Sequence, residues 1–115
     1  MAIPKNLDEC FTELNNMLGP LAIDEIRNEK ESSVRMFHYG LGTSIKNCWE
    51  LWRTHSPLTQ YFNQLGIYHA DDMSDIILTS FWRYLNNKPI NLEELIERYQ
   101  RSWPKFDQNM ASSEV

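Results

Sequence analysis

The stretch DDMSDIILTSFWRYL, residues 71–85, has the pattern of a long and deeply enclosed helix. Its apolar and small side chains recur every three or four residues, which places them on one face of a helix. Leu78 and Trp82 make that face wider than the stripe of a surface helix, so we predict that this helix is the centre of the domain. The main stripe consists of Met73, Ile76, Ile77, Ser80, Phe81, Tyr84 and Leu85.

Helix signals also appear before this stretch, whereas strand signals are rare. Asn6 followed by Glu9 is a capping pattern, and it precedes an apolar stripe of helical spacing. Gly19 and Pro20 end that stripe, and a proline suits the first turn of a second helix. We therefore predict two short helices in the first thirty residues.

The segment VRMFHYGLGTSIKNCWELW, residues 34–52, carries an apolar stripe through two glycines. Each glycine costs a helix about 1 kcal/mol relative to alanine. We nevertheless predict one long helix here, with close packing against another backbone at Gly40 and Gly42. The predicted stripe consists of Phe37, Leu41, Ile45, Cys48, Trp49 and Trp52.

Two further helices are predicted on either side of the central one. Ser56 and Pro57 form a cap and a first-turn proline, and the short helix that they open closes at Gly66. Asn91 and Glu94 repeat the capping pattern before the last apolar stripe. We therefore predict an all-α fold, a compact bundle of five to six helices, with residues 1–103 as a single domain and residues 104–115 as a flexible tail.

Composition narrows the class of protein. The chain has 115 residues and a formal net charge of -5, and it has no basic stripe, so a nucleic acid is a poor partner. No segment is apolar enough to span a membrane, and the first residues lack the pattern of a signal peptide, so we expect a cytoplasmic protein. In that compartment Cys10 and Cys48 are expected to be reduced thiols that act as small core side chains.

Motifs for catalysis are lacking in the sequence. His38, His55 and His69 do not have the spacing of metal ligands, and no phosphate-binding loop or nucleophile motif is found. We therefore expect neither a metal nor a cofactor, and no enzymatic activity. The competing interpretation is an enzyme in which His38 or His69 acts with Asp72 as acid and base.

The stretch HADDMSD, residues 69–75, is the densest acidic region. Carboxylates in the first turn of a helix meet the positive end of its dipole, and Asp71 is a natural cap, so capping explains the pattern. A surface that grips a basic partner is the functional alternative. The tryptophans pose the same choice, because a large ring either fills a core or anchors a partner.

Three motifs bear a resemblance to a known group of sequences: GLGTSIKNCWELW (residues 40–52), YFNQLGIYHADDMSDIIL (residues 61–78) and RYLN (residues 83–86). They resemble a family of small uncharacterised bacterial all-α domains with no established activity. Lys46 stands where arginine is more usual, and Cys48 and Glu50 stand where asparagine and glycine are expected. The resemblance therefore implies a fold but assigns no catalytic residue.

By analogy with other small acidic bacterial domains, we expect an immunity protein or antitoxin that occludes the active site of a basic toxin. The alternative is a helical accessory or regulatory domain that docks on a housekeeping partner, or forms a homodimer through the Trp49/Trp52 face. The residues predicted to bind the partner are Glu50, Trp52, Tyr68, Asp71, Asp72 and Asp75.

Overall fold

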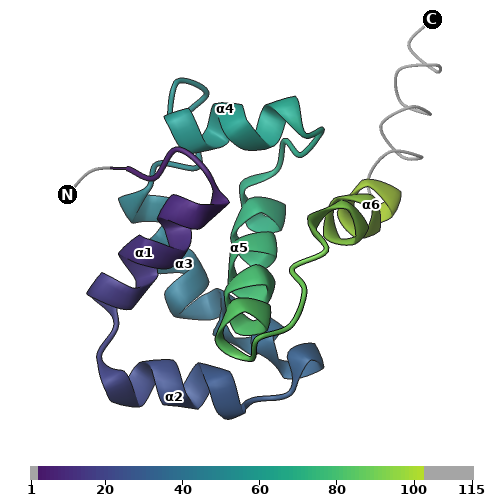
Figure 1. The fold of residues 1–115 in the computed structure, drawn as a ribbon. Coiled ribbons are helices and arrows are strands. Elements are labelled where there is room, and N and C mark those ends of the chain that lie inside the picture. Colours follow the sequence, from purple (N-terminus) through teal and green to yellow (C-terminus); the bar gives the residue numbers. More distant parts are fainter. Residues whose placement is uncertain (1–2, 103–115) are drawn as a thin grey trace, which may run out of the picture.

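The computed structural model describes residues 3–102, which contain six α-helices, one 3₁₀ helix and no strand (Figure 1). They fold as a single globule, which confirms the all-α prediction. Trp103 and the predicted tail lie outside the described residues. In chain order the elements are α1 (Leu7–Met17), α2 (Pro20–Asn28), η1 (Glu31–Tyr39), α3 (Leu41–Cys48), α4 (Pro57–Gln64), α5 (Ala70–Leu85) and α6 (Leu92–Ser102).

Helix α5 is the centre of the fold, as its wide apolar arc predicts. It contacts every other helix of the described chain, with α4 across one end and α2 across the other (Figure 1). All its residues from Asp72 to Arg83 are buried. The largest fully buried side chains of the described residues belong to α5 and to the elements that pack on it: Trp49, Phe62, Phe81, Leu14, Ile45, Leu58, Met73, Ile76, Ile77, Leu78, Leu95 and Val34.

The predicted start of α1 is confirmed in detail. The Asn6 side chain accepts a hydrogen bond from the backbone N–H of Glu9 at 2.9 Å. The Glu9 carboxylate in turn accepts one from the backbone N–H of Lys5, also at 2.9 Å. The first bond satisfies a backbone donor that the first turn of the helix leaves without a partner, and the second fixes the residue before the cap, Lys5, to the same turn.

Three of the helices end at a residue whose backbone has the left-handed conformation, with a positive φ. Gly66 (φ 90°) follows α4 and Asn87 (φ 58°) follows α5, which confirms the predicted ends of both helices. Glu50 (φ 54°) ends α3 in the same way. In each case the next residue donates a backbone hydrogen bond to the preceding helix, such as Ile67 to Phe62 at 2.9 Å.

The predicted long helix over residues 34–52 is wrong. The helix is interrupted at Gly40, whose backbone (φ -102°, ψ -84°) is not helical. A 3₁₀ helix before Gly40 and α3 after it replace the one continuous helix. Close backbone packing at Gly40 is wrong as well, because a Cβ there would have no atom within 4 Å. Gly40 instead forms the junction between the 3₁₀ helix and α3.

The predicted apolar stripe of this segment is also wrong at two positions, Cys48 and Trp52, which are both exposed. The buried face of α3 consists of Gly42, Ile45 and Lys46, and Trp49 continues it. Cys48 points away from that face and is exposed, although it is a free thiol as expected. Cys10 is a free thiol within the core, so the prediction of a core cysteine is correct for one of the two.

Candidate functional site

The loop between α3 and α4 presents Trp52 to solvent. Trp49 and Leu51 are buried within it, whereas 59% of Trp52 is exposed. Two hydroxyl groups hold the loop: Ser56 Oγ donates to the Trp49 carbonyl at 3.0 Å, and Thr59 Oγ1 donates to the Leu51 carbonyl at 3.3 Å. Trp52 is therefore an exposed ring on a loop that is fixed by buried side chains on both sides.

Polar contacts also orient the Trp52 ring. The Lys46 ammonium lies over the indole, 5.1 Å from the ring centroid. The indole N–H donates a hydrogen bond to Asn47 Oδ1 at 3.2 Å. Lys46 is almost fully buried and pairs with Asp71, with 2.6 Å between Nζ and Oδ1. This chain of contacts joins the Trp52 loop and α3 to the first turn of α5.

The first turn of α5 carries the acidic part of the site. The prediction that Asp71 caps this helix is wrong, because the cap is His69, whose Nδ1 accepts a hydrogen bond from the Asp71 backbone N–H at 3.2 Å. The Asp71 carboxylate is then left to pair with Lys46, near the positive end of the helix dipole. Tyr68 precedes the cap, and 74% of it is exposed.

The structure separates the residues predicted to bind a partner. Trp52 and Asp71 meet through Lys46, and Glu50 is half-exposed, with its carboxylate 4.0 Å from the Arg53 guanidinium. Asp72 and Asp75, in contrast, are only 8% and 9% exposed. The acidic stretch is therefore divided between a surface carboxylate and two carboxylates that lie within the fold.

Sequence reasoning did not identify Lys46 as part of this site. The available signal was its position, because a cation between Ile45 and Trp49 lies on the buried face of a helix. A buried cation needs an anionic partner, so that position implied a carboxylate on another helix. His69 also gave a signal, since it directly precedes the apolar pattern of α5, although histidine is an unusual cap.

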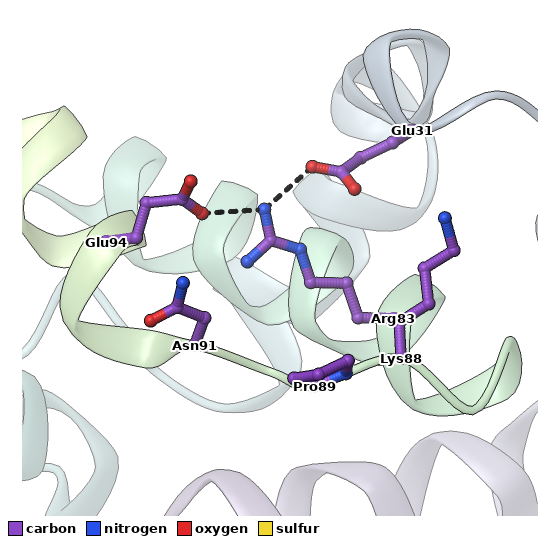
Figure 2. A pocket seen from close by; sticks show the side chains of 6 residues that line it. All are labelled: Glu31, Arg83, Lys88, Pro89, Asn91 and Glu94. Carbon is purple, nitrogen blue, oxygen red and sulfur yellow. Dashed lines mark hydrogen bonds and ion pairs between the residues drawn. The ribbon is translucent and has the colours of Figure 1, made fainter.

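A second polar cluster surrounds Arg83, near the other end of α5 (Figure 2). Its guanidinium donates to Glu31 of η1 at 2.7 Å, to Glu94 of α6 at 2.9 Å and to the Ile90 carbonyl at 2.7 Å. The hydrogen bond and charge of Arg83 hold the pKa of Glu31 below its usual value, and the two carboxylates raise the pKa of Arg83. Arg83 therefore ties three helices together.

An open hollow of about 460 Å³ lies over this cluster, lined by Glu31, Arg83, Lys88, Pro89, Asn91 and Glu94 (Figure 2). Its charged groups are engaged with the protein itself. Arg83 bridges the two carboxylates, and the Lys88 ammonium lies over the Trp82 ring, 5.1 Å from its centroid. We therefore assign the cluster a structural role, as a clamp between η1, α5 and α6.

Among residues 3–102, His, Cys, Asp and Glu side chains do not gather in any group of three that could hold a metal ion. None of the helices described is both long and apolar enough to cross a lipid bilayer. Of the residues in the enzyme interpretation, Asp72 is buried, the His69 ring caps α5, and the side chain of His38 is outside the description.

The chain also matches a protein family. A family described as a domain of unknown function, DUF6794, covers residues 3–85, which run from the start of the described chain to the end of α5. The chain therefore belongs to this family, and the predicted resemblance to an uncharacterised family is confirmed. No curated protein and no solved structure matches the chain significantly. The matched region contains the Trp52 loop and Arg83, whereas α6 lies beyond it.

Proposed function

We propose that this chain is a protein-binding domain, and specifically an immunity-type inhibitor that covers the active site of a basic bacterial toxin. The observation that carries the proposal is Trp52, a large ring exposed on a loop fixed by buried neighbours. Tryptophan is enriched among the side chains that dominate binding energy. A ring already held in place also loses little conformational entropy when a partner covers it.

Charge supports a basic partner. The chain carries a net charge of -5, and the half-exposed carboxylates of Glu50 and Asp71 accompany the exposed rings of Trp52 and Tyr68. An acidic surface speeds association with a basic partner and disfavours acidic competitors. In this proposal Asp72 and Asp75 contribute to the electric field from within the fold, while the other four residues make contact.

Co-expression with the product of the adjacent open reading frame tests the proposal. We expect the two proteins to co-purify, and the chain to restore growth of cells that the partner otherwise arrests. Trp52→Ala should weaken the complex about 30-fold, the effect of a hot spot of roughly 2 kcal/mol. Leu21→Ala is the matched control, because Leu21 is 85% exposed on α2, at the opposite end of the fold from α4 (Figure 1).

Two results would overturn this function: absence of binding to that product, or equal binding by the Trp52 and Leu21 variants. A second candidate is an accessory domain that associates with a copy of itself through the exposed Trp52 and Tyr68 rings. Trp49 is buried and cannot take part in such a dimer. Sedimentation of the purified chain distinguishes this candidate, since it requires a dimer that Trp52→Ala dissociates.

A further inference from the structure

We infer that Trp52 is the docking point for an arginine of the partner, whose guanidinium stacks on the outer face of the indole. The inference rests on the proposed function, since it names the partner chemistry that the same surface accepts. It depends on three features of the site: which face of the ring is open, what already occupies the other face, and the charge around it.

Only one face of Trp52 is available to a partner. Lys46 lies over the ring and is almost fully buried, so the exposed area of the indole belongs to the opposite face and the edges. The hydrogen bond from the indole N–H to Asn47 resists rotation of the ring. The site therefore presents a flat aromatic surface of fixed orientation.

The surroundings of this surface favour a cation. The Glu50 carboxylate is half-exposed two residues away, and its contact with Arg53 is long at 4.0 Å, so an incoming cation competes with a weak interaction. The Asp71 carboxylate pairs with the Lys46 ammonium and offsets its charge, so Lys46 repels a cation on the outer face less. A cation over the face of an indole gains further from the ring quadrupole.

The buried lysine makes arginine the better cation. The Lys46 ammonium already interacts with the π electrons on the inner face of the ring, although Asp71 offsets the charge of Lys46. An outer ammonium would depend on the same quadrupole and would have to lose a tightly held hydration shell. A guanidinium is planar and weakly hydrated, so it also gains from stacking and can pair with a carboxylate at the same time.

Two synthetic peptides test the inference without the partner. The ¹⁵N-labelled chain is titrated with N-acetylated hexaarginine amide and with hexalysine amide, and the backbone amide resonances of residues 50–53 are followed, because they are also present in a Trp52 variant. We expect hexaarginine to bind about two- to fivefold more tightly, the range that a cation–π contact supplies at an exposed site. Trp52→Leu, which keeps an apolar side chain without a π face, should lower the affinity for hexaarginine to that for hexalysine.

Control variants separate stacking from general charge. Leu21→Ala should keep the preference for arginine. Glu50→Gln should weaken the binding of both peptides, because it removes a negative charge and leaves the ring intact. Equal affinity of the two peptides for the unaltered chain overturns the inference, as does an arginine preference that survives Trp52→Leu. If either occurs while the partner still binds through Trp52, the proposed function stands and the arginine inference alone fails.

Discussion

Replacing Arg83 with methionine tests whether the cluster of Figure 2 holds the helices together. The substitution keeps an unbranched apolar stem but removes the guanidinium. It deletes the hydrogen bonds to Glu31, Glu94 and the Ile90 carbonyl in one step. The carboxylates remain, now without the cation that lies between them.

The expected cost follows from these contacts. Breaking a fully buried ion pair costs about 3–5 kcal/mol, because the remaining charge is left without a partner. Glu31 and Glu94 are partly exposed, so water can replace much of what they lose. We therefore expect Arg83→Met to lower the free energy of unfolding by about 2 kcal/mol, which lowers the melting temperature by roughly 8 °C in a domain of this size.

Urea unfolding followed by circular dichroism measures this cost. The matched control is Arg101→Met, since Arg101 is exposed and pairs with Glu97 at 3.4 Å within one helix, which predicts a change below about 0.5 kcal/mol. A double-mutant cycle with Glu31→Gln should give a coupling energy of about 1 kcal/mol. A loss no larger than that of the control, or an absence of coupling, would refute the clamp.

Other predictions concern single residues. Gly66→Ala should destabilise the fold by about 1–2 kcal/mol, because φ is 90° and the new Cβ would lie 2.2 Å from Gln100 Nε2. Chemical denaturation measures this loss. Adding Gln100→Ala should recover only the part of the loss that comes from the steric clash. A thiol reagent should label Cys48 in the native protein and Cys10 only on unfolding, since burial raises the pKa of the Cys10 thiol. The Arg83 hydrogen bond lowers the pKa of Glu31, so the ionised Glu31 carboxylate stabilises the fold above its ordinary pKa of 4.5, and this stabilisation is lost as the pH falls below that value. Glu31→Gln should reduce this acid dependence of the free energy of unfolding, measured in urea.

The helices could be predicted because their signals are local. The hydrogen bonds of Asn6 and Glu9 lie within residues 5–9, and a glycine at the end of α4 supplies the left-handed backbone that ends it. Gly40 shows where local reasoning was insufficient. A glycine in an apolar stripe is compatible both with close packing and with a break. The local pattern does not distinguish the two, and the structure has the break.

The candidate site could be predicted only in part, because it depends on contacts between distant segments. Trp52 and Asp71 were each predicted from the sequence to bind a partner, but no local sequence pattern connects two residues that are so far apart in the chain. The connection is Lys46, which lies over the ring of one and pairs with the carboxylate of the other. The sequence also does not show that α3 ends at Cys48, before Trp52, and that Glu50 then takes a left-handed backbone.

The positions of Asp72 and Asp75 follow from the enclosure of α5. A helix that contacts neighbours on all sides cannot direct every polar residue outward, and Asp72, Asp75, Thr79 and Arg83 are spaced three or four residues apart on one buried face. Buried polar groups persist in proteins only with partners, and both aspartates interact with neighbours here. Replacing either aspartate therefore disturbs the core as well as the surface charge. A loss of binding in such a variant can be assigned to the interface only if its free energy of unfolding is unchanged.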